Sequence, residues 1–267
     1  MKVLSVLSLA LLFSACSHSP SRTTSMKASL RLGWIPSATF SGEVAGMRLF
    51  AKQHGLEVEI RPGGASLNTV TLVASGQDTF GTLAADEVLL ANENGADLTI
   101  VGVINDVSPG GFVALKKSGI RSPRDFPGHK IGVLPFGSTT LLYEAMLAAN
   151  GVDRSTIHEV TISPDLRPFI QGVYDVQPVF AYDETVTLDR QGIQYTLIEP
   201  KAFGVQLKGP VYFTRRSTVE NHPELVDAFI RTVVEGWNYA INKPDEAIRM
   251  LKDFAPDVDA DRERTVL

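Results

Sequence analysis

Short apolar segments typical of β-strands alternate with helical patterns along most of the chain after residue 29. Residues 56–60 alternate apolar and polar side chains, as in a half-buried strand, whereas residues 223–242 carry Leu, Phe, Val and Trp at helical spacing. Parallel strands need such intervening helices to connect them. The alternation therefore predicts an α/β protein with mostly parallel sheets.

The order of these elements predicts two α/β lobes. We expect the first lobe over residues 29–115, the second over residues 116–209, and a return to the first over residues 210–267. The chain would then cross between the lobes twice, near Leu115 and near Pro210. Two crossings make a hinge, and a hinged cleft suits closure around a small ligand.

Three expectations concern particular elements at the two ends of the folded part. Residues 30–34 are expected to form the first strand, and residues 42–54 one helix that ends at Gly55. A last helix is expected from Pro244, followed by an acidic, poorly patterned tail.

The N-terminus has the features of an export signal. The apolar run at residues 3–13 is shorter than the roughly 20 residues that a membrane-spanning helix needs. We expect residues 1–15 to be a signal peptide and the Ser- and Thr-rich residues 16–28 to be a tether. Cys16 follows small residues, as in the lipobox of bacterial lipoproteins, although Phe13 stands where that motif usually has Leu.

These features predict an exported protein, periplasmic or on the outer face of the cell membrane, with a lipid anchor on Cys16. The alternative is a plain signal peptide with an incidental cysteine. Because Cys16 is the single cysteine, no intramolecular disulfide and no cysteine metal cluster can form.

Charge and histidine spacing argue against two further kinds of partner. The 30 Asp and Glu residues outnumber the 25 Lys and Arg residues, and the chain has no basic run, so nucleic-acid binding is not expected. The five histidines are scattered without the spacing of a metal motif. We therefore expect no metal and no cofactor.

Several short segments resemble a known family over nearly the whole chain after the leader. They are Gly-Leu-Glu-Val-Glu-Ile-Arg-Pro-Gly-Gly at 55–64, Ala-Ser-Gly-Gln-Asp-Thr-Phe-Gly at 74–81, Leu-Lys-Lys-Ser-Gly-Ile at 115–120, Phe-Pro-Gly-His-Lys-Ile-Gly-Val at 126–133, His-Pro-Glu-Leu at 222–225 and Glu-Gly-Trp at 235–237. In order and spacing they resemble the periplasmic substrate-binding proteins of ABC importers, in the branch similar to the yeast thiamine-pyrimidine synthase. That branch includes binders of the aminopyrimidine precursor of thiamine, with aliphatic sulfonate and taurine binders as close relatives.

The resemblance implies a two-lobed periplasmic-binding-protein fold of type II, with each lobe a mostly parallel sheet flanked by helices and the ligand in the interlobe cleft. It also implies a transporter permease and its ATPase as partners, and we expect a monomer. Family members usually continue past the position of Leu267 with helices that pack on the first lobe, so we expect either fewer such contacts here or a truncated product.

Ligands of open α/β sheets bind outside the carboxyl ends of strands, where loops enter helices. The residues that this rule selects as ligand-binding candidates are Trp34, Thr39, Ser41, Asp86 with Glu87, Asn105, Gly137, Ser138, Thr139, Thr140, Tyr182, Asp183 and Glu184.

Each candidate also has a purely structural interpretation. Trp34 offers a flat face for a planar ring, but a core tryptophan is equally compatible with its position. The helix start at residues 137–140 can hold a sulfonate, a phosphate or a carbonyl oxygen on free N–H groups, or can be an ordinary Ser/Thr cap. Trp237, in a long apolar-striped helix, is expected to pack in the core.

The Tyr182-Asp183-Glu184 segment is the sharpest candidate. The resembling proteins carry an Asn-Glu pair after this strand, and the resemblance implies that an acidic side chain there binds the amino group of an aminopyrimidine ring. In this chain Asp183 replaces the Asn, and Glu184 retains the acid. A carboxylate can accept from an amino group and a protonated ring nitrogen together, and it would repel a sulfonate. The alternative is that Asp183 caps the helix and Glu184 lies in its first turn, and Asp86 has the same two interpretations.

These observations predict a binding protein for a small polar ring compound such as an aminopyrimidine thiamine precursor. An aliphatic sulfonate or taurine is the alternative ligand. The yeast synthase uses a cysteine-rich, histidine-containing segment for iron chemistry, and this chain has no counterpart to it, so we expect no enzyme. The alternative from another class is an exported lyase or dehydratase that uses carboxylates at the cleft.

Overall fold

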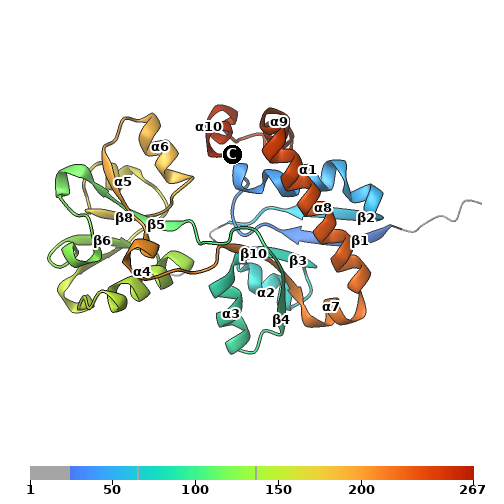
Figure 1. The fold of residues 1–267 in the computed structure, drawn as a ribbon, viewed down its shortest axis with the longest axis horizontal. Coiled ribbons are helices and arrows are strands. Elements are labelled where there is room, and N and C mark those ends of the chain that lie inside the picture. Colours follow the sequence, from blue (N-terminus) through green and yellow to red (C-terminus); the bar gives the residue numbers. More distant parts are fainter. Residues whose placement is uncertain (1–24, 65, 136) are drawn as a thin grey trace, which may run out of the picture.

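A computed structural model describes residues 25–64, 66–135 and 137–267 of the chain. Two five-stranded sheets, each flanked by helices, form two lobes that are joined by two crossing segments (Figure 1). The predicted two-lobed α/β fold is confirmed. The predicted signal peptide and Cys16 lie outside the described residues.

The first sheet has the strand order β2-β1-β3-β10-β4, in which only β10 runs antiparallel to its neighbours. Its strands are β1 (Met26–Arg31), β2 (Leu56–Arg61), β3 (Phe80–Ala84), β4 (Leu98–Val103) and β10 (Pro210–Arg215). The first strand thus begins four residues before the predicted start at residue 30, and Met26 to Ala28 belong to the sheet rather than to the tether. The reason is long-range pairing, since all six residues of β1 pair in register with β2.

Helices cover both faces of this sheet (Figure 1). They are α1 (Ser41–Leu49), α2 (Thr69–Ala74), α3 (Ala85–Glu93), α7 (Arg216–Asn221), α8 (Pro223–Asn242), α9 (Pro244–Phe254) and α10 (Ala260–Val266), with 3₁₀ turns η1 (Ala38–Phe40) and η2 (Ala51–His54).

The helix α1 packs closely across α8, and this contact depends on glycine. A Cβ at Gly236 would lie 2.1 Å from the carbonyl oxygen of Gly42. Beneath α8, Phe229 stacks on Phe80 with ring centroids 3.9 Å apart. The helix predicted over residues 42–54 ends as α at Leu49 and continues as the 3₁₀ turn η2 up to Gly55.

The second sheet has the order β7-β6-β8-β5-β9, again with one antiparallel strand, β5. Its elements are β5 (Gly110–Leu115), β6 (Lys130–Val133), β7 (His158–Thr161), β8 (Val176–Phe180), β9 (Tyr195–Ile198), α4 (Ser138–Ala149), α5 (Arg167–Ile170), α6 (Glu184–Arg190) and the 3₁₀ turns η3 (Lys116–Ser118), η4 (Pro123–Asp125), η5 (Arg154–Thr156) and η6 (Pro200–Phe203).

The first crossing between the lobes lies before β5, not near Leu115 as predicted. Because β5 pairs with β8 and β9, the chain has already entered the second lobe at Gly110. An apolar run identifies a strand but not the sheet that it joins, which is why the prediction was wrong. The two crossing segments are bonded to each other, from Ser108 N to Leu207 O at 2.8 Å and from Gly209 N to Asn105 O at 3.0 Å.

The C-terminal residues, which we expected to be an acidic, poorly patterned tail, form the helix α10. The carboxylate of Asp259 accepts from the backbone N–H groups of Asp261 and Arg262 and caps this helix. Glu263 is buried and accepts from the backbone N–H of Ala38, which fixes α10 to the first lobe. Figure 1 shows α10 beside α9, on the side that faces α6 of the second lobe.

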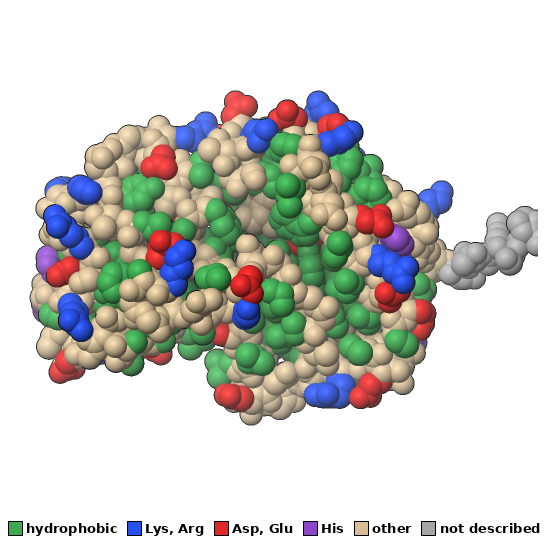
Figure 2. Space-filling model, in the orientation of Figure 1, with side chains coloured by type: hydrophobic (Ala, Val, Ile, Leu, Met, Phe, Trp, Pro, Cys, Tyr) green, Lys and Arg blue, Asp and Glu red, His purple; other side chains and the backbone are tan. Residues whose placement is uncertain are grey.

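Two surface properties bear on partners. Among the described residues, no helix is both long and apolar enough to cross a membrane. On the face shown in Figure 2, acidic and basic side chains are interspersed, without one broad patch of a single sign.

Candidate ligand-binding site between the lobes

The N-terminal ends of α3 and α4 meet where the two lobes approach each other. Ser138, after β6, donates from its hydroxyl to Oδ1 of Asp86, after β3, over 3.2 Å. The carboxyl ends of strands from the two sheets therefore bring these two predicted residues together. Asp86 is the second residue of α3, and Ala84 occupies the cap position, so the interpretation of Asp86 as a helix cap is wrong.

The helix α4 begins at Gly137, whose φ of 104° lies in the region that favours glycine. No side chain caps this helix, which excludes the ordinary Ser/Thr cap. The hydroxyl of Thr140 donates to Leu134 O at 2.9 Å, and Thr139 and Ser138 are buried. The first backbone N–H groups of α4 therefore lie at the junction between the lobes. Two of them are already engaged, since the N–H of Thr140 bonds Gly137 O at 3.1 Å and that of Ser138 bonds the Glu87 carboxylate.

Asp183 and Glu184 occupy the corresponding position after β8. Asp183 does not cap α6; its carboxylate and its carbonyl oxygen both accept from the guanidinium of Arg262 in α10. Glu184 turns back, so that its Oε2 accepts from the backbone N–H of Phe180 at 2.7 Å. Burial, together with the negative charge of Asp183, raises the pKa of Glu184 to about 7.

The pKa values of further acidic and phenolic groups around this junction are also raised. Burial raises the pKa of Asp86, and burial with the Asp86 charge raises that of Glu87 to about 7. Burial and the charges of Asp183, Glu184 and Glu43 raise the pKa of Tyr182. The common cause is desolvation, which penalises the charged form of each group.

The structure places the remaining predicted residues in the first lobe and the hinge. Trp34 is 36 % exposed and belongs to none of the hydrophobic clusters, so the core interpretation is wrong. Thr39 and Ser37 share a hydroxyl hydrogen bond of 2.8 Å, and Ser41 is buried at the start of α1. Asn105 lies in the first crossing segment, bonded through its backbone.

Sequence reasoning missed a buried carboxyl in the first turn of α1. Glu43 is fully buried, and its Oε1 accepts from the hydroxyl of Tyr212 at 2.6 Å. That hydroxyl in turn accepts from Nε1 of Trp237 at 2.9 Å. Burial raises the pKa of Glu43 to about 7. The sequence carries no signal for this role, because an acid in the first turn of a helix is common.

Trp237 combines packing with this polar role. Its ring covers Gly42, where a Cβ would lie 2.2 Å from the ring. Trp237 is half-buried and belongs to none of the hydrophobic clusters of the described residues, so it packs against α1 rather than in the core that we predicted. Arg262 is the second functional candidate that sequence reasoning missed, because it lies in the segment taken for a tail.

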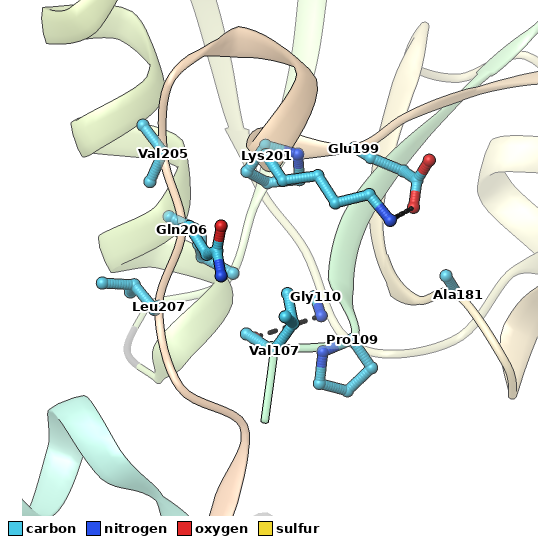
Figure 3. Close-up of a pocket in the computed structure, with 12 residues that line it drawn as sticks. Val107, Pro109, Gly110, Ala181, Glu199, Lys201, Val205, Gln206 and Leu207 are labelled. Atoms are coloured by element: carbon cyan, nitrogen blue, oxygen red, sulfur yellow. Dashed lines mark hydrogen bonds and ion pairs between the residues drawn. The ribbon is translucent and has the colours of Figure 1, made fainter. Parts of the chain in front are cut away.

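A small cavity of about 50 Å³ lies beside the hinge, and none of the predicted residues lines it (Figure 3). It is lined by Val107, Pro109, Leu207 and a Glu199–Lys201 ion pair of 3.0 Å. A cavity of this volume holds water rather than a ring compound. Within residues 25–64, 66–135 and 137–267, no group of three or more His, Cys, Asp or Glu is placed to hold a metal ion.

Two hinged lobes with polar groups at the strand ends that face each other define a two-lobed α/β solute-binding protein. The solved structure of the periplasmic aliphatic sulphonate binding protein SsuA from Escherichia coli has this fold, with a TM-score of 0.75 at 19 % identity, covering 90 % of this chain and 82 % of that chain. SsuA from Xanthomonas axonopodis pv. citri, bound to MOPS, gives a TM-score of 0.68 at 20 % identity over 90 % and 83 % of the chains.

The NMT1/THI5-like family model matches residues 44–247, and the chain belongs to that family. The 4-amino-5-hydroxymethyl-2-methylpyrimidine phosphate synthase of Legionella pneumophila is 25 % identical over 86 % of this chain and 74 % of its own length. The formylaminopyrimidine-binding protein of Halalkalibacterium halodurans is 27 % identical over 82 % and 68 %. The taurine-binding periplasmic protein of E. coli is 26 % identical over 73 % and 61 %. The predicted family and the predicted solute-binding role are confirmed.

Proposed function

We propose that the chain captures a small aminopyrimidine-type compound between its lobes and passes it to the permease and ATPase of an ABC importer, without converting it. The observation that carries this proposal is the placement of Glu184. One carboxylate oxygen accepts from the Phe180 backbone, and we expect the carboxylate to accept from a ligand amino group as well. A protonated ring nitrogen beside that amino group adds a charge-assisted hydrogen bond.

The relatives support the same class of ligand. Two of them are named for aminopyrimidine compounds, one as a binding protein and one as a synthase. Binding without conversion is favoured because this chain carries no cysteine beyond Cys16 and no clustered histidines. We further propose that Cys16 is lipidated and anchors the exported protein through the tether.

An aliphatic sulfonate is the second candidate, and the start of α4 is the observation that favours it. No side chain caps this helix start, and a helix N-terminus can bind an anionic oxygen. The acidic groups at Asp86, Glu87 and Glu184 oppose that ligand by charge repulsion, so the aminopyrimidine is preferred.

Thermal melting of the mature chain from Ser17 tests this proposal. A ligand at 1,000 times its Kd stabilises a protein by about 4 kcal/mol, and we expect such a shift with 4-amino-5-hydroxymethyl-2-methylpyrimidine but not with taurine. Glu184→Gln should weaken the pyrimidine about 10- to 100-fold, the range for a hydrogen bond to a charged group. The exposed Glu93→Gln, at the end of α3, is the control. A shift with taurine alone would contradict the proposal.

A further inference from the structure

Three buried acceptor atoms without partners lie in helix starts at the carboxyl ends of strands of the first sheet. Within the described part of the chain, Ser41 Oγ, Glu43 Oε2 and Asp86 Oδ2 are buried and have no hydrogen-bond partner. The first two belong to the first turn of α1 and the third to that of α3. The strands that precede these helices, β1 and β3, are parallel neighbours, so the two helix starts lie at the same edge.

Glu43 is held rigidly in this position. The Tyr212 hydroxyl accepts from Trp237 and therefore directs its own hydrogen to Oε1 of Glu43. The Trp237 ring closes against the backbone of Gly42. One carboxylate oxygen is thus committed to the protein, whereas Oε2 is buried without a donor, an arrangement that disfavours the unliganded site.

This edge of the first lobe faces the second lobe. Asp86 accepts from Ser138 of α4, and the charge of Glu43 acts on the Tyr182 phenol beside Asp183 and Glu184. The cation at this junction, Arg262, is already engaged by Asp183 and Glu263. Acceptors therefore lie on both sides of the junction.

We propose that Glu43 is a specificity-determining residue that, with Ser41 and Asp86, forms a second acceptor subsite opposite Glu184, so that the preferred ligand carries two separated donor groups and positive charge. The inference rests on the proposed function and narrows its ligand class. An aminopyrimidine with an aminomethyl arm meets both requirements, because the ring amino group serves Glu184 and the ammonium serves Glu43. The corresponding hydroxymethyl compound carries the ring amino group for Glu184 but no ammonium group for Glu43.

Calorimetric titration of the mature chain with these two pyrimidines tests the inference. We expect the wild-type protein to bind 4-amino-5-aminomethyl-2-methylpyrimidine at least tenfold more tightly than its 5-hydroxymethyl counterpart. Glu43→Gln keeps the acceptor for Tyr212 and removes the charge, so it should abolish most of that preference. Ser41→Ala, a smaller change at the same subsite, should reduce it, and Glu93→Gln should leave it unchanged.

The outcomes separate the inference from the proposed function. A preference that stays the same in a cooperatively melting Glu43→Gln protein and in Ser41→Ala would overturn the inference and leave the proposed function standing. A wild-type protein that binds neither pyrimidine overturns both.

Discussion

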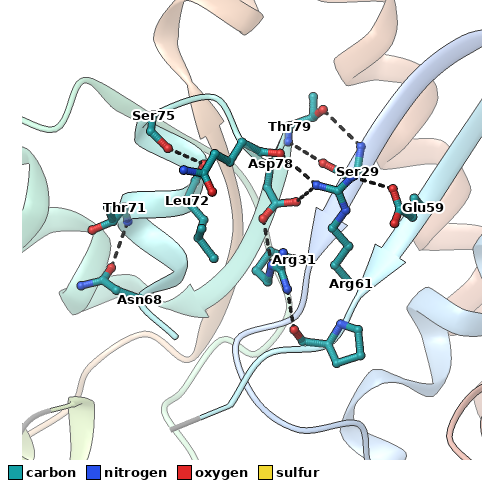
Figure 4. A network of polar contacts seen from close by, with 12 residues as sticks. Ser29, Arg31, Glu59, Arg61, Asn68, Thr71, Leu72, Ser75, Asp78 and Thr79 are labelled. Atoms are coloured by element: carbon teal, nitrogen blue, oxygen red, sulfur yellow. Dashed lines mark hydrogen bonds and ion pairs between the residues drawn. The ribbon is translucent and has the colours of Figure 1, made fainter. Parts of the chain in front are cut away.

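At the scale of single residues, a buried carboxylate holds the edge of the first sheet together (Figure 4). The side chain of Asp78 is fully buried and accepts from Nε of Arg31 at 2.8 Å and from Nη1 of Arg61 at 2.9 Å. Arg61 also bonds Glu59 at 2.6 Å. Because Asp78 joins strands β1 and β2 to the turn before β3, its charge is structural rather than part of the ligand site.

Replacing Asp78 with Asn leaves two guanidinium groups without their shared buried anion. Breaking a buried pair in this way costs about 3–5 kcal/mol, so urea denaturation should show a loss of that order for Asp78→Asn. Asp97 pairs with Arg216 at the surface, and Asp97→Asn should cost no more than about 1 kcal/mol. Equal losses in the two variants would refute this account of Asp78.

At the scale of elements, the helix α10 bridges the lobes. Glu263 fixes it to Ala38 in the first lobe, while Arg262 bonds Asp183 and donates to the hydroxyl of Thr187 at 3.1 Å in the second. A second contact, between Arg190 and Asp259, spans 3.5 Å at the exposed surface. These contacts tie the two lobes together, and we expect them to favour a closed arrangement even without ligand.

Arg262→Ala should loosen this closure, because it removes the partly buried ion pair between α10 and α6. Small-angle X-ray scattering of the ligand-free protein should then give a larger radius of gyration than the wild type. Arg264, on the same helix, pairs with Asp245 within the first lobe, so Arg264→Ala is the matched control. If Arg262→Ala and Arg264→Ala give the same radius of gyration, the Arg262 contact does not hold the lobes together.

At the scale of the whole molecule, buried carboxyls link stability to pH. Burial raises the pKa of Glu43, Glu87 and Glu184 from 4.5 to about 7 in the folded chain. The folded protein then binds protons more tightly than the unfolded chain, so these groups stabilise the fold fully below about pH 4.5 and lose this effect as the pH rises to about 7.

We therefore expect the free energy of unfolding to fall between pH 5 and pH 7.5, by up to about 3 kcal/mol for Glu43. Glu43 faces Tyr212 of β10, Trp237 of α8 and the Tyr182 phenol, none of which carries a compensating positive charge. Urea titrations across this range should show a shallower fall for Glu43→Gln than for the wild type and Glu93→Gln. If the free energy of unfolding falls equally with pH in all three proteins, the buried Glu43 carboxyl is not the cause of the fall.

Local patterns predicted the elements but not their long-range partners. The strand β2 and the helix α8 follow from periodicity. Asp86, Ser138, Asp183 and Glu184 follow from the rule for strand ends. The sheet that β5 joins, by contrast, depends on pairing with β8 and β9 far along the chain.

Long-range partners also explain why two site residues, Glu43 and Arg262, were not predicted. Glu43 is buried by Tyr212, which lies 169 positions later, and Asp183 is bound by Arg262, 79 positions later. In the sequence, Glu43 resembles an ordinary acid in a first helical turn, and Arg262 lies in a polar segment without an apolar stripe. Only tertiary packing distinguishes them.

The central claim is that acceptor groups between the lobes select an aminopyrimidine. Calorimetric titration of the wild-type mature chain with 4-amino-5-hydroxymethyl-2-methylpyrimidine, and separately with taurine, tests it most directly. The account predicts saturable binding of one pyrimidine per chain and no binding of taurine. Binding of taurine without binding of the pyrimidine would contradict it and would move the site to the start of α4.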